Sequence, residues 1–210
     1  MTGRFITVEG GEGAGKTSGM QALASILDQR GIPHLITREP GGTAIGERVR
    51  SILLDPKVSD LAVDAELLLV FAARAQHLAT VIEPALADGT WVLCDRFTDA
   101  SYAYQGGGRG MPFERIEVLE AWVQGERRPD LTLLLDLEPE QGLARALRDR
   151  PADRFERERT NFYRRVRRAY LERAKREPER IAVIDASRTR RAVLTEIRRT
   201  LTTFLEGIDD

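Results

Sequence analysis

A glycine-rich loop at residues 10–17 constrains the fold of this 210-residue chain more than any other feature. Its sequence, Gly-Gly-Glu-Gly-Ala-Gly-Lys-Thr, matches the pattern GxxxxGK(S/T) and directly follows the apolar run 5–8. Glycines let successive backbone N–H groups turn towards a polyphosphate, and the next helix points its positive end at the same anion. In such a loop Lys16 reaches the β- and γ-phosphates, and the Thr17 hydroxyl ligates Mg²⁺. The sequence therefore predicts a phosphate-binding loop between a strand and a helix, with a nucleoside triphosphate as ligand. The predicted nucleotide-binding residues are Gly10, Gly11, Glu12, Gly13, Ala14, Gly15, Lys16 and Thr17.

The overall charge argues against a general polyanion binder. The chain carries 32 basic and 33 acidic residues, so we expect neither nucleic acid nor a membrane among its partners. The single cysteine, Cys94, excludes an internal disulfide and lies in an apolar run, which predicts a buried thiol in a reducing compartment. No apolar run approaches 18 residues, and the N-terminus lacks the pattern of a signal peptide. These features predict a cytoplasmic protein.

Apolar, β-rich runs alternate with segments of helical periodicity along the whole chain. This alternation predicts an α/β fold in which helices cover both faces of a five-stranded parallel sheet. No second-domain boundary is visible, so residues 1–210 are predicted to form one domain. The predicted strands are 4–9, 34–38, 91–95, 131–137 and 181–185. The predicted helices are 16–30, 43–54, 64–87 (bent near Pro84), 112–124, 139–148, 159–177 and 189–206.

Arginine is concentrated between residues 145 and 191, where sixteen arginines and one lysine face eight acidic residues. Acids interleave with the arginines and aromatics are few, which favours solvated helices with i,i+4 ion pairs over a nucleic-acid surface. The segment 145–157 contains Pro151 and lacks an apolar period. It is predicted to be an arginine-rich loop, and in a phosphate-handling enzyme such a loop suits a closing lid, placed here at 146–157.

Further arginines lie where an acceptor phosphate would bind. A kinase that acts on a nucleoside monophosphate holds a second phosphate beside the first, and this requires cations that a simple NTPase lacks. Arg38 and Arg96 follow strands, and the carboxyl ends of parallel strands line the ligand crevice. Arg50 and Arg74 lie on predicted helices, where composition alone fits an ordinary exposed arginine equally well.

Several segments occur in the order that is found in a known family. They are 9–17, 37–43 (Thr-Arg-Glu-Pro-Gly-Gly-Thr), 71–74 (Phe-Ala-Ala-Arg), 95–97 (Asp-Arg-Phe), 103–106 (Ala-Tyr-Gln-Gly), 129–133 and 135–136. With them the chain resembles the bacterial thymidylate kinases over nearly its whole length. The resemblance implies a P-loop nucleoside monophosphate kinase that converts ATP and dTMP into ADP and dTDP with Mg²⁺ as cofactor.

The resemblance also implies roles for single residues. Glu12 would contact the 3′-hydroxyl region of the deoxyribose, and Arg96 would hold the acceptor phosphate and neutralise the transition state. Asp95 would hold a magnesium-bound water, although a local pairing with Arg96 is an alternative. The Glu39–Pro40 bond is expected to be cis, and Tyr104 is expected under the sugar. The implied catalytic residues are Glu12, Lys16, Arg96, Arg148 and Arg150, with Thr17 and Asp95 as metal residues. The implied dTMP-site residues are Arg38, Glu39, Pro40, Arg50, Phe71, Arg74, Arg96, Ser101, Tyr104 and Gln105, of which Arg74 reads the thymine edge.

Two departures from the family pattern leave choices open. Gly13 stands where one branch of the family carries an arginine, so a catalytic cation must come from elsewhere, and in the branch that this chain resembles the lid supplies it. The aligned lid position holds Asp149, which leaves Arg148 and Arg150 as alternatives and Arg154 as a possible lid anchor. Thymine stacking is expected from an aromatic one turn before Arg74. Val70 stands four residues before it and Phe71 three, so Phe71 is either the stacking ring or a core residue.

Other properties follow only from the family. It is usually dimeric, and an apolar face on 64–87 would suit a self-complementary contact, although an internal helix has the same pattern. The adenine site is placed near 185–188 by analogy. Because thymine differs from uracil by one methyl, worth about 1–3 kcal/mol, preference for dTMP over dUMP should be modest. The rival functions are a deoxynucleoside kinase, which would need a general base, a non-catalytic nucleotide-binding regulator, and a nucleic-acid-binding module.

Overall fold

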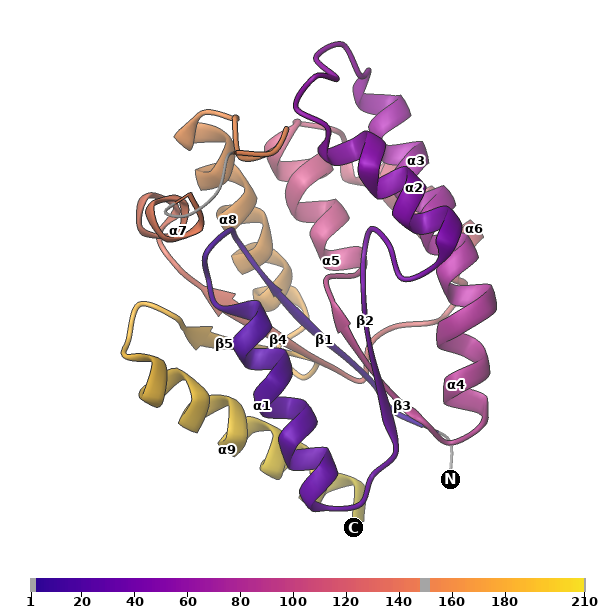
Figure 1. Ribbon diagram of the computed structural model, residues 1–210, viewed down its shortest axis with the longest axis vertical. Coiled ribbons are helices and arrows are strands. Elements are labelled where there is room, and N and C mark those ends of the chain that lie inside the picture. The colour runs from indigo at the N-terminus through magenta and orange to yellow at the C-terminus, as the bar shows by residue number, and fades with distance from the viewer. Residues whose placement is uncertain (1–2, 148–151, 210) are drawn as a thin grey trace.

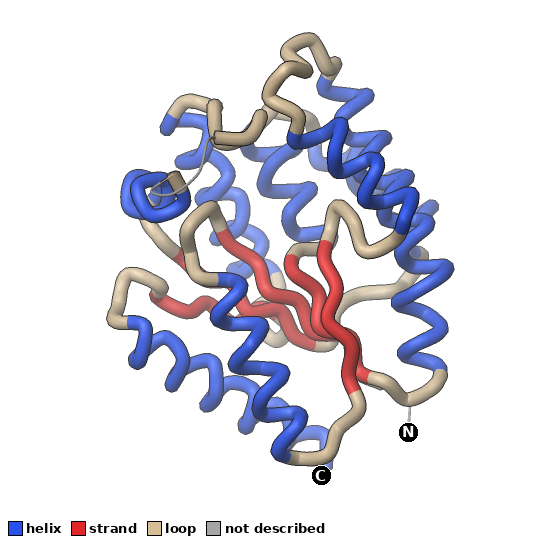
Figure 2. Tube along the Cα trace, in the orientation of Figure 1, coloured by secondary structure: helices blue, strands red, loops and turns tan. Residues whose placement is uncertain are grey.

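In a computed structural model, which describes residues 3–147 and 152–209, five strands form one parallel sheet. The spatial order is β2-β3-β1-β4-β5, and the carboxyl ends of the strands face the same side, where the loops gather (Figures 1 and 2). The predicted fold class is confirmed. The strands are β1 (Phe5–Gly10), β2 (His34–Arg38), β3 (Trp91–Asp95), β4 (Leu131–Asp136) and β5 (Ile181–Asp185).

The sheet is the centre of the core because helices cover both of its faces. Alternate side chains of a strand point to opposite faces, so Ile6 and Val8 pack against one layer and Phe5 against the other. Figure 1 shows α1 and α9 side by side on the first face. Cys94 is buried on the second face, as predicted. The helices are α1 (Lys16–Gln29), α2 (Ala44–Leu54), α3 (Val63–His77), α4 (Glu83–Ala87), α6 (Phe113–Gln124), α7 (Pro139–Ala146), α8 (Thr160–Arg176) and α9 (Arg190–Asp209).

The predicted long helix 64–87 is divided by a wide π-helical turn, η1 (Leu78–Ile82), between α3 and α4. Proline has no N–H, so Pro84 cannot donate to the carbonyl one turn earlier, and the wider turn accommodates this break. By length and composition the segment Val63–Ala87 could cross a membrane, a possibility that the sequence analysis did not anticipate. Half of its apolar stretch is buried within this fold, where it serves as a core helix.

Two elements between β3 and α6 were not predicted: the short helix α5 (Thr98–Ser101) and the π-helix η2 (Tyr102–Gly108). Three consecutive glycines argue against a helix by propensity. Here they permit close packing, because a Cβ on Gly107 would lie 2.6 Å from Ala169 of α8 and one on Gly108 would lie 2.5 Å from Phe162. Tertiary contact therefore outweighs propensity.

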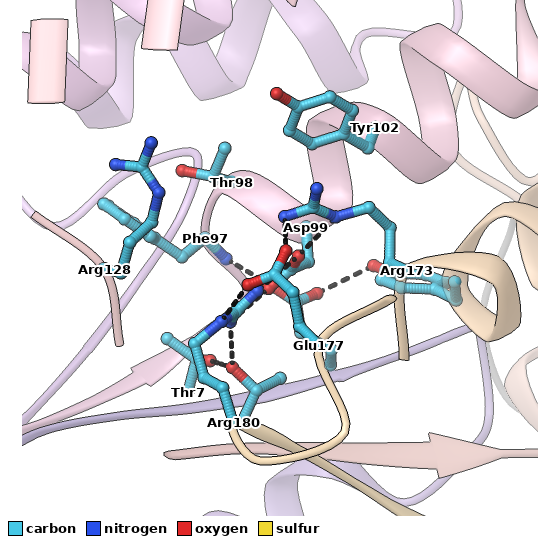
Figure 3. A network of polar contacts seen from close by, with 12 residues as sticks. Thr7, Phe97, Thr98, Asp99, Tyr102, Arg128, Arg173, Glu177 and Arg180 are labelled. Carbon is cyan, nitrogen blue, oxygen red and sulfur yellow. Dashed lines mark hydrogen bonds and ion pairs between the residues drawn. The ribbon is translucent and has the colours of Figure 1, made fainter. Parts of the chain in front are cut away.

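A buried ionic network fastens α5 to α8 and the sheet (Figure 3). Asp99 accepts hydrogen bonds from Arg173 Nε at 3.0 Å and from Arg180 Nη1 at 2.8 Å. Arg180 Nη1 also donates to the hydroxyl of Thr132 at 2.8 Å. Burial opposes ionisation of Asp99, yet the two guanidinium groups lower its pKa. Arginines of the 145–191 region thus also pair across elements, and the predicted i,i+4 pairs account for only part of them.

Candidate active site

The phosphate-binding loop connects β1 to α1 as predicted. Gly10, Gly13 and Gly15 have φ values of 138°, 66° and 95°, which side chains disfavour. The Nζ atom of Lys16 donates to the carbonyls of Gly10 at 3.2 Å and Gly11 at 2.9 Å, so it lies across the loop. Burial and the nearby Arg96 cation lower the pKa of Lys16. The loop thus presents a cation and the N-terminus of a 14-residue helix to the same space.

Arg96 lies directly after β3 and connects the loop to the rest of the site. Its φ of 70° is the only positive value for a non-glycine residue in the described parts of the chain, and such strain is concentrated at functional positions. Its Nη2 donates to Glu12 Oε1 at 2.6 Å and to the hydroxyl of Tyr104 at 2.8 Å, and this hydroxyl donates to Glu12 Oε1 at 2.8 Å. Burial opposes ionisation of Glu12, but Arg96 and Lys16 lower its pKa to about 2. Glu12 is therefore a carboxylate that orients two neighbours.

A pocket opens beside Glu12, and it combines apolar walls with several convergent polar groups, as small-molecule sites do. Its predicted lining residues are Glu12, Glu39, Pro40, Arg50, Arg74, Arg96, Ser101, Tyr104 and Gln105. The other lining residues were not predicted for this site, and they are Leu53, Leu54, Val70, Phe97, Ala100, Asp153 and Phe155. Helices α2, α3 and α5, η2 and residues 153–155 of the predicted lid segment therefore converge on one cavity.

Arg74 is held from one side and is 1% exposed. Its Nε donates to Glu39 Oε2 at 2.7 Å, and its Nη2 donates to the carbonyl of Phe97 at 3.1 Å and to Ser101 Oγ at 3.0 Å. The remaining nitrogen, Nη1, is buried and has no hydrogen-bond partner among the described residues. A buried unpaired donor is costly unless a ligand satisfies it. Arg74 thus offers a fixed, unused donor in a pocket wall.

Two predicted dTMP-site residues, Arg38 and Phe71, do not line this pocket. Phe71 belongs to the core and lies against the Arg74 guanidinium, 4.6 Å from its central carbon, while Val70 lines the pocket. The i−4 position of the helix, rather than i−3, thus faces the cavity. Arg38 is half exposed, pairs with Glu47, and borders a shallower opening on the other side of the loop. The Glu39–Pro40 bond is cis, as the resemblance implied.

The two predicted metal residues share that shallower opening. Thr17 and Asp95 both line it, and Asp95 Oδ1 is buried without a hydrogen-bond partner in the described part of the chain. The alternative pairing of Asp95 with Arg96 is not observed, because Arg96 pairs with Glu12. Within the described ranges, no group of three or more His, Cys, Asp or Glu side chains is placed to hold a metal ion by itself. A Mg²⁺ ion usually takes one or two protein oxygens together with phosphates and water, and this donor set fits that pattern.

The lid candidates Arg148 and Arg150, like Asp149, lie outside the described residues. The chain after them is firmly attached at Arg154, whose Nε donates to the Leu53 carbonyl at 2.6 Å and whose Nη2 donates to Glu66 at 2.6 Å. The helix before them, α7, lies directly on the phosphate loop. A Cβ on Gly142 would overlap the carbonyl oxygen of Glu12, and one on Gly13 would overlap that of Gly142. Both ends of the lid segment are thus tied to the site.

Sequence reasoning assigned no role to three buried polar side chains near the site. The Glu9 carboxylate accepts hydrogen bonds from Phe97 N and from the Tyr170 hydroxyl, both at 2.7 Å, and burial raises its pKa to about 8. Glu66 binds Arg154 and Gln105, and His77 binds Glu39. The signal was available, because each is a polar residue on the buried face of an otherwise apolar strand or helix.

Comparisons with known proteins agree with this geometry. The sequence model of the family described as thymidylate kinase matches residues 8–197. A thymidylate kinase of Ectopseudomonas mendocina is 57% identical over 207 residues, which cover 99% of each chain. One of Pseudomonas entomophila is 55% identical, with coverage of 99% of this chain and 97% of its own. The crystal structure of thymidylate kinase from Ehrlichia chaffeensis superposes with a TM-score of 0.76 at 33% identity, covering 96% of this chain and 99% of its own.

Proposed function

This chain belongs to the thymidylate kinase family, and on that premise we propose how its residues share the transfer of the γ-phosphoryl group of ATP to dTMP. An oxygen of the dTMP phosphate bonds to the γ-phosphorus, and the bond from that phosphorus to the β–γ bridging oxygen breaks. ADP and dTDP are the products, so the enzyme acts in dTTP biosynthesis.

The donor side is the phosphate loop. Its backbone N–H groups hold the β- and γ-phosphates of ATP, and Lys16 exchanges its two carbonyl partners for phosphate oxygens. Thr17 would ligate Mg²⁺, and Asp95 would hold a water of the ion through its unpartnered oxygen. The bound ion supplies charge neutralisation at the β- and γ-oxygens.

The acceptor side is the pocket lined by Arg50, Arg74 and Arg96. Arg96 holds the dTMP phosphate, and it suits a position between donor and acceptor because its Nη2 also lies 3.3 Å from the Gly10 carbonyl of the loop. Arg50 adds a second cation, and Arg38 contributes long-range charge from the adjacent opening. A phosphate acceptor is already anionic, so alignment and charge stabilisation replace a general base.

Base recognition rests on the observation that carries this proposal, the unpaired Nη1 of Arg74. A thymine carbonyl would satisfy this donor, with Ser101 and Gln105 completing the pocket wall. Tyr104 lies under the sugar, where an added 2′-hydroxyl would collide, and Glu12 accepts from the 3′-hydroxyl. Glu39 and Pro40 shape the wall, and Glu39 contributes through Arg74. Phe71 supports the guanidinium from the core, as its contact with Arg74 suggests.

Residues 146–157 serve as the lid of this single domain. Because Gly13 leaves the loop without an arginine, the lid supplies the catalytic cation from Arg148 or Arg150. The attachment of Arg154 to Glu66 and to the Leu53 carbonyl supports a fixed hinge at the far end of the lid.

A coupled ADP-release assay with ATP, Mg²⁺ and a panel of acceptors tests the assignment. We expect dTMP to be the best acceptor and dUMP the next. Turnover of thymidine without turnover of dTMP would indicate a deoxynucleoside kinase, and absence of turnover with every acceptor would indicate a regulator.

We further propose a cytoplasmic homodimer that forms through α3 and α6. Leu68 on α3 and Val118 and Trp122 on α6 are exposed, and Trp122 is 80% exposed, which is unusual for a large apolar side chain. Sedimentation of Trp122→Glu should give a monomer, whereas Val183→Glu, at an exposed apolar position on β5, should leave the dimer intact. A monomeric parent protein would contradict this interface.

A further inference from the structure

A fully buried histidine at the end of α3 has no part in the reaction as described above. His77 is 0% exposed, and both of its ring nitrogens are engaged. Nδ1 lies 3.0 Å from Glu39 Oε1, and Nε2 lies 2.7 Å from the hydroxyl of Thr37 at the end of β2. The ring therefore bridges a helix and the strand end that leads into the acceptor pocket.

Glu39 continues this bridge to the base-reading arginine. Its Oε1 faces His77, and its Oε2 accepts from Arg74 Nε at 2.7 Å. Glu39 is 4% exposed, so water does not compete strongly for either oxygen. The result is a continuous chain, Thr37–His77–Glu39–Arg74, in which each member fixes the orientation of the next. This chain sets the direction of the unpaired Arg74 Nη1 together with the hydrogen bonds from Nη2 to the Phe97 carbonyl and to Ser101.

The charges assign donors and acceptors within the chain. The Glu39 carboxylate and the Arg74 guanidinium already balance each other in a buried environment, where a second cation on the same carboxylate would leave an unfavourable net charge. An ionised carboxylate only accepts, so neutral His77 donates from Nδ1 to Glu39, and its Nε2 accepts from the Thr37 hydroxyl. One tautomer is therefore required.

The loop after β2 rests on the same pair of side chains. A Cβ on Gly42 would lie 2.5 Å from His77 Nε2 and 2.6 Å from Thr37 Oγ1, so only glycine fits over them. Arg50 Nη1 donates to the carbonyl of Pro40 at 3.0 Å, which connects this loop to a cation of the acceptor site. His77 thus adjoins the loop that supports both the base-reading and the phosphate-holding arginines.

We propose that His77 is a positioning residue for base recognition: through Glu39 it fixes the direction in which Arg74 presents its free N–H to thymine, and so it sets the preference for the thymine base. This inference rests on the proposed role of Arg74. His77 touches neither substrate, so its effect is on acceptor binding and selection rather than on phosphoryl transfer itself.

The experiment compares steady-state kinetics of His77→Leu, His77→Asn and Leu78→Ala with dTMP, dCMP and ATP as varied substrates. Loss of the hydrogen bonds that orient Arg74 should weaken dTMP binding about tenfold. His77→Leu should therefore raise KM for dTMP about tenfold, and it should lower the ratio of kcat/KM for dTMP to kcat/KM for dCMP about tenfold. The kcat at saturating dTMP and the KM for ATP should stay within about twofold of the parent. His77→Asn keeps a donor towards Glu39 and should recover most of the loss.

Leu78→Ala is the control for packing, because Leu78 is a buried neighbour outside the chain of hydrogen bonds. It should lower the thermal midpoint and leave the dTMP-to-dCMP ratio unchanged. The inference is overturned if His77→Leu lowers stability alone, or if Leu78→Ala changes the ratio equally. If His77→Leu does not fold, two measurements replace it. The first is the same kinetic comparison on Thr37→Val, and the second is the ¹⁵N spectrum of His77, which must show a protonated Nδ1. Arg74→Ala separates the two proposals: if it leaves the ratio intact, the base-reading role itself is wrong.

Discussion

The buried carboxyl group of Glu9 makes stability depend on pH in a direction opposite to most acids. Burial, with help from the negative charge of Asp99, raises its pKa from the ordinary 4.5 to about 8. The folded protein therefore keeps a proton that the unfolded chain releases. The contribution of Glu9 to the free energy of unfolding is fully present below about pH 4.5 and falls by about 1.4 kcal/mol per pH unit until about pH 8, a total on the order of 5 kcal/mol.

The variant Glu9→Gln removes this dependence and keeps the shape. Its amide oxygen can still accept from Phe97 N, and its amide group can donate to the Tyr170 hydroxyl. Urea denaturation of the ligand-free proteins at pH 5, 6, 7, 8 and 9 measures the effect. Between pH 5 and pH 8, the free energy of unfolding of the variant should rise by several kcal/mol relative to that of the parent. The contributions of other titrating groups cancel in this difference. Glu114→Gln, at an exposed position on α6, should show no such trend. A difference between parent and Glu9→Gln that does not change with pH would refute the reasoning.

Three further outcomes are expected. Arg96→Ala should reduce kcat by at least about a thousandfold while isothermal titration shows ATP affinity nearly unchanged, and an equal loss of ATP affinity would show that its role is misassigned. Gly142→Ala should weaken ATP binding and lower kcat because the new methyl group overlaps the Glu12 carbonyl. The control Gly207→Ala on α9, where the space is open, should change neither quantity. Equal kinetics for the two variants would show that the contact between α7 and the loop does not matter for ATP binding. Arg148→Ala and Arg150→Ala should differ in kcat at least about tenfold, and two equally mild effects would place the lid cation elsewhere.

The sequence predicted the sheet well because its strands are short apolar runs followed by recognisable loops. Boundaries of β2, β3 and β5 agree to the residue, and the phosphate loop lies where its glycines indicated. Local signals were enough because the glycine-rich motif indicates where β1 ends, and the apolar strand before the motif supports its assignment as a phosphate-binding loop. The element after Arg96 was missed for the opposite reason, since the glycines of η2 are helical only through contact with α8.

The residues of the proposed acceptor pocket were predicted through the resemblance more than through residue chemistry. Eight of ten named residues line it, while Arg38 and Phe71 do not. Helical periodicity could not decide between Val70 and Phe71, because positions three and four before Arg74 lie on nearly the same face. No motif contains the supporting polar residues Glu66 and His77, because their partners are 38–88 residues away in the sequence.

The backbone contact between Gly13 and Gly142 limits how this enzyme could evolve. The branch of the family that carries an arginine in the phosphate loop cannot be reached from this chain by one substitution at residue 13, because any side chain there would overlap the α7 carbonyl. Helix α7 would first have to shift, and that shift alone, without the new arginine, would bring no catalytic benefit. We therefore expect substitutions at residues 13 and 142 to be epistatic.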